Sequence, residues 1–341
     1  MVFPFNKCVF YINGGRDWLH VNSGDELSKM DKNVNKVSIS DNVCNLHEGS
    51  IPNYITHLRI SNRNITRGII PNSVTYLILN CFMPFNPNII PDSVIFLYLD
   101  SLVCFDPFSE SLPSSVKYLH FGQSFNSTIP INILPHTILY LDMGWNFNRP
   151  IIPRTLQGIK YLIFGYSFNE ELGPGCIPDT VTHLRLGSCF NKKINPGDIP
   201  KSVKYLDCSS NMRYDFTRYN IPGVTSLSCS YTYNRDILDI DSITELRIGP
   251  FFNSKVRLEN LVYLDIYDNI YRLDFDNLSD TMFIRSKSYK TRPNKWTINS
   301  CKYFNSFDKE RGQTNTWIIQ SIHDSIISYV PIELVFYMLE Y

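Results

Sequence analysis

Large apolar residues recur along the chain in the frame V-x-x-L-x-L, whose first position is Val, Ile or Leu. The frame can be followed through twelve units, and successive units start 18 to 22 residues apart. The first apolar anchors are Val34, Ile55, Val74, Val94, Val116, Ile138, Ile159, Val181, Val203, Val224, Ile243 and Leu261. Repetition with this period predicts an elongated stack of units and not an ordinary globular domain.

Each unit predicts one short strand. The L-x-L alternation has period two, so Leu77 and Leu79 should face the interior while Tyr76 and Ile78 face outward. An Ile-Pro pair followed by small or polar residues precedes many frames, as in IPNSV from Ile70. Because proline fixes φ and small polar residues suit tight turns, this segment should bend the chain into the strand. Few residues remain for the return path, which favours extended or turn-like structure over a helix.

Polar residues commonly follow the last anchor by three positions, which gives the pattern L-x-x-L-x-L-x-x-N/C/S/T typical of leucine-rich repeats. A Phe-Asn pair comes next, at Phe125-Asn126, Phe147-Asn148, Phe168-Asn169, Phe190-Asn191 and Phe252-Asn253, with Phe85-Asn86 displaced by two residues. We expect the Phe to form a buried spine and the Asn to complete a turn. Together with the proline, this pattern resembles the FNIP repeat, a relative of leucine-rich repeats found in amoebae and in the giant DNA viruses that infect them.

The resemblance covers roughly Val34 to Tyr271 and implies a mainly β repeat solenoid with a parallel sheet of about twelve short strands. The expected organisation is an N-terminal cap at residues 1–33, the solenoid at 34–278, a polar connecting segment at 279–315 and a helical C-terminal cap at 316–341. Within the first cap, the stretch INGGRDW is expected to form a hairpin over the first strand edge. At the other end, Ile319, Ile322, Ile326 and Val330 recur at helical spacing.

Charge and composition limit the possible partners. The 32 basic and 32 acidic residues give a formal net charge of zero, which argues against nucleic acid and acidic membrane surfaces. The start lacks the apolar stretch of a secretory signal, and no run of 18 apolar residues occurs, so we expect a soluble, intracellular and cytoplasmic protein. Nine cysteines without a C-x-x-C pair favour reduced, packed thiols over disulfides or a zinc site.

No motif indicates catalysis. Phosphate-binding loops, nucleophile elbows, zinc-protease pairs and dinucleotide fingerprints are all missing from the sequence, so neither an enzyme nor a cofactor is expected. His57, His120 and His183 fall on outward strand positions about three strands apart, too far to share a metal. Asp142, Asp207 and Asp265 are likewise separated by intervening strands.

The outward face of the predicted sheet is the candidate binding surface. One outward column is aromatic over successive units, the next is mixed and charged, and the third is small, with Gly122, Gly144, Gly165 and Gly187 in sequence. These columns predict partner binding by Tyr76, Phe96, Tyr118, Tyr140, Tyr161, His183, Tyr205, Arg185, Asp142 and Asp207. The rings at 118, 140 and 161 should then be partly exposed beside the glycines. Alternatively, neighbouring rings stack on each other and only stabilise the sheet.

The sequence therefore predicts a non-enzymatic scaffold that binds a partner protein of unknown identity through this face. One alternative rests on VPIELVFYMLEY from Val330, which resembles the first helix of an F-box. It implies docking to ubiquitin-ligase components through Pro331, Glu333, Leu334 and Leu339, whereas the other interpretation of this fragment is an apolar capping helix. A further alternative is a glycan-binding surface built on the tyrosines.

Overall fold

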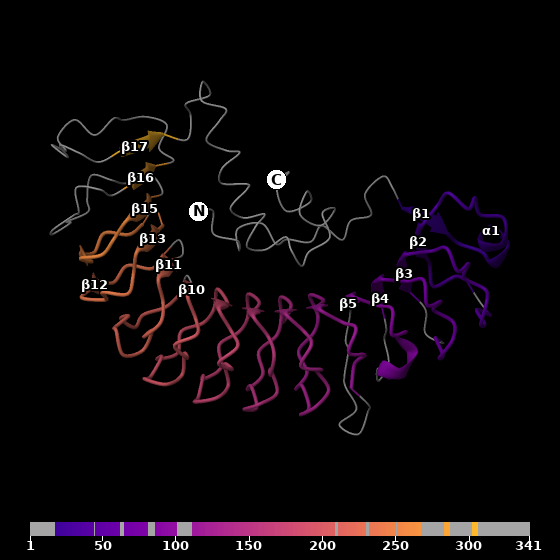
Figure 1. Cartoon of the computed structure of the whole chain (residues 1–341), viewed down its shortest axis with the longest axis horizontal. Coiled ribbons are helices and arrows are strands. Elements are labelled where there is room, and N and C mark those ends of the chain that lie inside the picture. Colours follow the sequence, from indigo (N-terminus) through magenta and orange to yellow (C-terminus); the bar gives the residue numbers. More distant parts are fainter. Residues whose placement is uncertain are drawn as a thin grey trace.

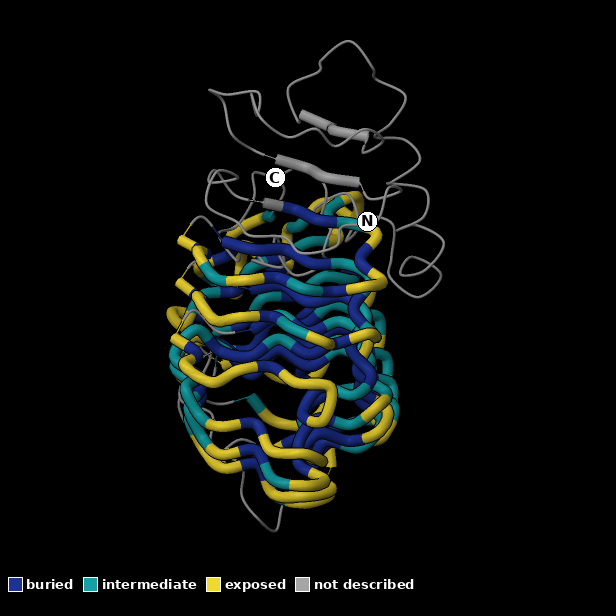
Figure 2. Tube along the Cα trace, turned by 90° about the vertical axis from the view of Figure 1, so that its left-hand side faces the viewer, coloured by how far each residue is buried: buried dark blue, intermediate teal, exposed yellow. Residues whose placement is uncertain are grey.

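A computed structural model shows that the chain is a curved solenoid. The structure describes residues 18–43, 45–61, 65–80, 86–100, 111–208, 211–229, 232–249, 251–266, 283–286 and 302–305. Consecutive units stack along an arc with their strands on its inner side and the return segments on its outer side (Figure 1). Buried and exposed residues recur at equivalent places in successive turns of the chain (Figure 2). The fold is thus the mainly β repeat solenoid that the sequence predicts.

One parallel sheet of fifteen strands runs through the stack in the order β1-β2-β3-β4-β5-β6-β7-β8-β9-β10-β11-β13-β15-β16-β17. Its strands are β1 (Leu19–Val21), β2 (Lys36–Ile39), β3 (His57–Ser61), β4 (Tyr76–Asn80), β5 (Phe96–Asp100), β6 (Tyr118–Phe121), β7 (Tyr140–Asp142), β8 (Tyr161–Ile163), β9 (His183–Arg185), β10 (Tyr205–Cys208), β11 (Ser226–Cys229), β13 (Glu245–Ile248), β15 (Tyr263–Ile266), β16 (Phe283–Ser286) and β17 (Lys302–Asn305). Equivalent frame positions pair in register, so Leu141 lies beside Leu119 and Leu162. Equivalent residues of successive units therefore form columns that run across the sheet.

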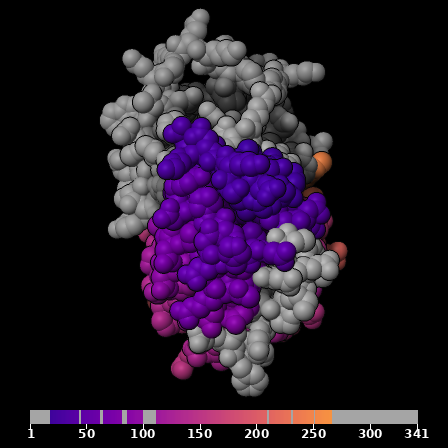
Figure 3. Space-filling model, turned by 90° about the vertical axis from the view of Figure 1, so that its right-hand side faces the viewer, coloured from indigo at the N-terminus to yellow at the C-terminus, as the bar shows by residue number. Residues whose placement is uncertain are grey.

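The sheet extends past both ends expected from the sequence. Strand β1 lies within the expected N-terminal cap, and β16 and β17 lie within the expected polar connecting segment 279–315. Strand β1 joins β2 in parallel, with the short helix α1 (Gly24–Ser28) between them. The hairpin expected at INGGRDW falls on residues 12–18, all but the last of which lie outside the described residues. Figure 3 looks onto this N-terminal end of the stack. The expected C-terminal helices, including Pro331, Glu333, Leu334 and Leu339, lie outside the described residues.

Return segments are extended or turn-like, as predicted, with a single turn of 3-10 helix, η2 (Pro87–Ile89), among those described. A two-stranded sheet of β12 (Ile237–Leu238) and β14 (Val256–Arg257) pairs two of them on the outer side. The Ile-Pro turns also form as predicted: the amide N–H of Val94 donates to the carbonyl of Pro91 at 3.1 Å. Ser93 Oγ then donates to the carbonyl of Val74 in the preceding unit at 2.7 Å. This turn is therefore tied to the preceding unit.

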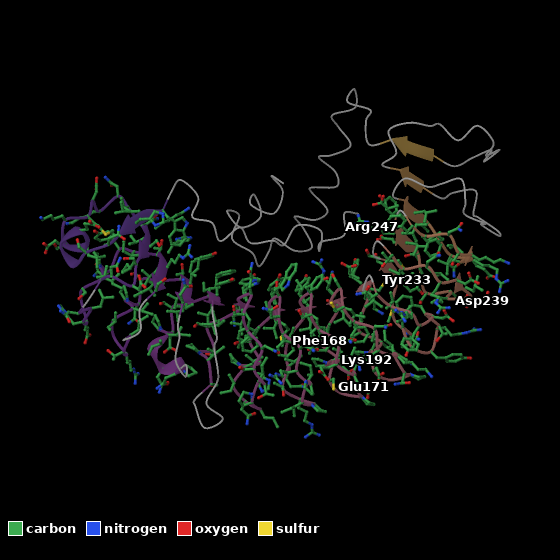
Figure 4. All side chains as sticks on the ribbon, turned by 180° about the vertical axis from the view of Figure 1, so that it is seen from behind. Phe168, Glu171, Lys192, Tyr233, Asp239 and Arg247 are labelled. Carbon is green, nitrogen blue, oxygen red and sulfur yellow. The ribbon has the colours of Figure 1, made fainter. Side chains whose placement is uncertain are left out.

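The Phe-Asn pairs build the interior of the stack. Phe147, Phe168 and Phe190 are buried, and their rings stack at centroid distances of 6.0 Å with interplanar angles of 8° and 5°. This confirms the predicted spine, which continues to Tyr233 and Phe252 with a 6.4 Å ring separation. In Figure 4, Phe168 and Tyr233 lie within the stack, while Arg247 lies toward its inner side and Asp239 toward its outer side.

Asn126, Asn148, Asn169 and Asn191 accept hydrogen bonds from the next unit, which corrects the sequence expectation for these residues. Asn86 Oδ1 accepts from the N–H of Asn88 in its own turn at 3.0 Å, as expected. The N–H of Asn148 donates to Asn126 Oδ1 at 2.9 Å, and the N–H of Asn191 donates to Asn169 Oδ1 at 2.8 Å. Where Arg213 takes the place of Asn, its backbone N–H still donates to Asn191 Oδ1 of the preceding unit at 3.2 Å. In these units, one asparagine side chain satisfies a backbone donor of the following unit.

The glycine column has a packing role. A Cβ at Gly165 would overlap the carbonyl oxygen of Gly144, and one at Gly187 would overlap that of Gly165. At Gly144 the backbone also has φ of 76°, which an L side chain rarely adopts. These glycines let consecutive units approach closely, and that requirement accounts for them without a ligand.

Candidate partner-binding face

A repeated corner positions the outward side chains. The N–H groups of Lys160 and Tyr161 both donate to the carbonyl of Leu139, each at 2.9 Å. The same shared carbonyl recurs in the next unit, where Thr182 and His183 donate to Lys160 at 2.9 and 3.1 Å. Because two successive N–H groups donate to one carbonyl, the alternation of inward and outward side chains is interrupted at this corner. Both residues then lie outside the core while the following leucine enters it.

The first outward column, which we call the aromatic column, holds Tyr76, Phe96, Tyr118, Tyr140, Tyr161, His183 and Tyr205. Its rings stack along the arc: Tyr76 and Phe96 lie 4.2 Å apart with an interplanar angle of 3°, and His183 and Tyr205 lie 4.1 Å apart at 13°. Tyr161 continues the second stack at 4.5 Å from His183. The predicted aromatic ladder is therefore confirmed at these pairs.

Three predicted binding residues are more buried than the sequence suggests. Phe96, Tyr140 and Asp142 are exposed by only 4%, 9% and 8%. Tyr140 packs with Ile163 between the half-buried rings of Tyr118 and Tyr161. The expectation of partial exposure is correct for residues 118 and 161 and wrong for residue 140, because the flanking side chains cover the central ring.

The second outward column pairs charges between neighbouring strands. Asp142 Oδ2 lies 3.1 Å from His120 Nδ1, and Asp207 Oδ2 lies 3.5 Å from Arg185 Nε. Burial raises the pKa of Asp207 above its usual value, and the charge of Arg185 partly opposes that rise. Each of these two acids thus lies beside a basic side chain of the neighbouring strand.

The most buried ion pair of this column joins Arg247 to Asp265. Two guanidinium nitrogens of Arg247, Nε and Nη2, each lie 3.0 Å from Asp265 Oδ2, and the side chains are exposed by 7% and 0%. In the register of the sheet, Arg285 of β16 follows Asp265 in the same column. Residue types of opposite charge thus occupy this column on β13, β15 and β16, whereas β17 has Phe304 at the same position.

Burial also fixes the protonation of the aromatic column. It raises the pKa of Tyr118 to about 12, so this phenol stays a neutral hydrogen-bond donor at physiological pH. Burial and the charge of Lys160 lower the pKa of His183 to about 3, so this imidazole is neutral as well. Its Nδ1 lies 2.8 Å from Thr182 Oγ1. The column therefore presents polar but uncharged groups.

A row of lysines borders the aromatic column, and the outward-column reasoning missed it. Lys117, Lys160 and Lys204 occupy the corner position immediately before Tyr118, Tyr161 and Tyr205. We call these three residues the lysine row. The sequence signal was present in the repeated tetrapeptides VKYL, IKYL and VKYL, which occur on every second unit. The lysine row was not predicted because these residues precede the L-x-L segment, and alternation within that segment does not determine whether they face inward or outward.

The described residues bring together no cluster of three or more metal-ligating side chains. The histidines at 57, 120 and 183 lie on β3, β6 and β9, separated as predicted. In the part of the chain that the structure describes, no helix has the length and apolar character needed to cross a membrane.

Comparison with known proteins identifies the repeats. The family description FNIP Repeat matches residues 42–82, 62–101, 108–146 and 147–189, whereas no curated protein matches the chain. Among solved structures, a similar one is titled "The crystal structure of CroV588 a novel circular LRR protein structure", with a TM-score of 0.68 and 24% identity. The alignment covers 83% of this chain and 48% of that one, so this chain spans about half the length of the solved structure. Residues 42–101 and 108–189 are therefore FNIP repeats, and the solenoid that contains them is similar in fold to that circular LRR protein.

Proposed function

We propose that the chain is a non-enzymatic scaffold that binds a partner protein across the inner face of its sheet. The observation that carries this proposal is the ordered aromatic column, in which Tyr161, His183 and Tyr205 stack yet remain partly exposed. Tyrosines contribute strongly to protein interfaces because they combine large apolar area with a polar hydroxyl. Rings already held by stacking lose little further conformational freedom on binding.

The burial pattern narrows the proposed contact residues. Tyr76, Tyr118, Tyr161, His183, Tyr205, Arg185 and Asp207 remain candidates for direct contact. Phe96, Tyr140 and Asp142 then act by supporting their neighbours, since little of their surface is exposed. Acidic and basic side chains within one column favour a partner of mixed polarity, which fits a protein surface.

Affinity capture from cells with three forms of the full chain tests this proposal. The inner-face variant carries Tyr118→Ser and Tyr161→Ser, and the matched control carries Tyr214→Ser and Tyr219→Ser in an exposed return segment. We expect the control to retain the proteins bound by the wild type, and the inner-face variant to lose them by more than tenfold at a temperature at which both variants are folded. Equal capture by all three forms would contradict binding through the inner face.

The same experiment separates the two alternatives. Recruitment for ubiquitin ligation would give ligase components that depend on Leu334 and Leu339 and not on the tyrosines, tested by Leu334→Asp with Leu339→Asp. Glycan binding would give glycoproteins that are lost after enzymatic deglycosylation. Neither result would fit a scaffold that contacts polypeptide through the aromatic column.

A further inference from the structure

The lysine row has a period of two units along the inner face. Lys117, Lys160 and Lys204 precede β6, β8 and β10, whereas the intervening units carry Leu139 and Thr182 at the same position. Every lysine of the row adjoins a tyrosine of the aromatic column. The repeating surface element is therefore one cation and one ring on every second strand.

Among the described residues, none of these lysines forms an ion pair with a carboxylate. Lys117 Nζ donates to the carbonyl of Ser114 at 3.3 Å, and Lys204 Nζ donates to the carbonyl of Lys201 at 3.0 Å. Lys160 Nζ lies 5.6 Å from the ring centroid of Tyr161. Carbonyl and ring contacts leave the full positive charge of each ammonium group in place.

The turns next to the lysine row contain little negative charge to offset the lysines. Asp179 is the one carboxylate in turns 113–115, 135–137, 153–158, 178–180 and 200–202, all of which are described, whereas Arg154 and Lys201 add positive charge. The charge of Lys160 also lowers the pKa of His183 within the aromatic column. A ligand that follows this border of the sheet therefore meets regularly spaced cations beside partly exposed rings.

The spacing between the lysines of the row favours one backbone conformation for such a ligand. Two strand separations span about 9.6 Å, and three residues of a polyproline II helix rise about 9.3 Å. An extended β strand repeats one face every two residues, about 6.7 Å, and seven residues of an α-helix rise about 10.5 Å. Over the whole row the polyproline II mismatch is about 0.6 Å, whereas the α-helical mismatch is about 1.8 Å.

We propose that the lysine row and its tyrosines bind a partner segment in the polyproline II conformation with a carboxylate at every third residue. Each carboxylate pairs with one lysine, and the intervening proline or aliphatic residues pack on Tyr118, Tyr161 and Tyr205. Aromatic surfaces are a general recognition mode for this conformation. The inference rests on the proposed scaffold function and specifies the partner segment for the same face.

Two labelled synthetic peptides test this inference by fluorescence anisotropy with the full chain. One contains five Glu-Pro-Pro triplets, and the other has the same composition with its glutamates together at one end. We expect the periodic peptide to bind at least tenfold more tightly than the clustered one. Equal affinities, or no binding of either peptide, would overturn the proposal. A single-stranded oligouridylate that binds more tightly than both peptides would assign the row to nucleic acid and also overturn it.

Lysine variants provide the second test. Exchanging Lys117, Lys160 and Lys204 for Gln should weaken binding of the periodic peptide at least tenfold, whereas the same exchange at Lys192, Lys193 and Lys255 on the return segments should leave it unchanged. Lys160→Gln alone should show a smaller loss if the triple variant folds poorly. Unchanged affinity in the row variants would contradict the inference.

Capture from cells distinguishes failure of this inference from failure of the scaffold proposal. If the triple lysine variant retains the native partners that Tyr118→Ser with Tyr161→Ser loses, the polyproline II inference fails and the scaffold proposal stands. If neither variant changes capture, both fail. Loss of the same partners in both variants is the result we expect.

Discussion

The backbone N–H of Asn169 donates a hydrogen bond to Oδ1 of Asn148 at 2.9 Å, joining the same position of two consecutive units. Neither asparagine is fully exposed. The bond therefore satisfies a backbone donor that has limited access to water, and its repetition ties each unit to the next. Stability in such a stack depends mainly on contacts between neighbours.

Replacing Asn148 with Ala removes the acceptor for the N–H of Asn169. We expect the free energy of unfolding to fall by about 1–2 kcal/mol, because the donor loses its partner in a partly buried position. Asn148→Asp keeps an acceptor oxygen and should cost less. Urea unfolding of the two variants measures the difference, and a larger loss with Asp than with Ala would contradict the role assigned to this oxygen.

Gly165→Ala should destabilise the stack although the backbone of Gly165 does not have a positive φ. The new methyl group would overlap the carbonyl oxygen of Gly144, so two units must separate or shift. Overpacking of this kind typically costs about 1–3 kcal/mol. Gly24→Ala is the matched control, since a Cβ there meets no atom within 4 Å. Thermal melting of both variants tests the prediction, which fails if they melt together.

His183→Tyr should change how stability depends on pH. Because the pKa of His183 falls to about 3 in the folded chain, the unfolded chain binds the proton more readily between that value and about 6.5. Stability from the neutral imidazole is complete above this window and is lost as the pH falls through it. The loss is about 2 kcal/mol at pH 5 relative to pH 7.5.

Tyrosine keeps an aromatic ring in the column but does not titrate in this range. The difference in unfolding free energy between the variant and the wild type should therefore shift in favour of the variant on acidification. Chemical denaturation at pH 5 and pH 7.5 measures this shift, with the other titrating groups common to both proteins. A difference that is independent of pH would show that the imidazole is not held neutral by its surroundings.

Arg247→Met should be strongly destabilising, because it leaves the carboxylate of Asp265 buried without its guanidinium. Breaking one side of a buried pair costs about 3–5 kcal/mol, whereas replacing both sides with apolar residues often costs little. Arg247→Met with Asp265→Leu should therefore be more stable than the single variant. The exposed pair of Arg257 and Asp239 is the control, and Arg257→Met should cost less than about 1 kcal/mol. Similar losses at the two arginines would contradict the burial argument.

The apolar frame alone determined the architecture, because one large residue at each anchor position can be buried only if equivalent units stack in register. Val116, Leu119 and Phe121 illustrate this relation, since all three are inaccessible to solvent as their spacing predicts. The buried phenylalanine spine and the Ile-Pro turns followed from the sequence for the same reason. Local patterning was sufficient wherever a position had one physical role in every unit.

The apolar repeat frame did not predict strands in units whose first anchor position lacks an apolar residue. By the register of the sheet, the second anchor position of β1, β16 and β17 is taken by Leu19, Ile284 and Tyr303. Three residues before them, the sequence has Arg16, Thr281 and Ser300. These polar residues interrupt the apolar pattern, so the sequence placed all three strands outside the repeats. Parallel pairing with a neighbouring strand supplies backbone hydrogen bonds whatever the side chain at that position.

Contacts between units were decided only by the tertiary structure. The bond from Asn169 to Asn148, the burial of Tyr140 by its neighbours and the pairing of Arg247 with Asp265 all join residues about twenty positions apart. The lysine row became visible only because two N–H groups share one carbonyl and turn Lys160 away from the core. A one-dimensional pattern gives the faces of one strand, whereas exposure and charge pairing depend on which side chains the next strand brings alongside.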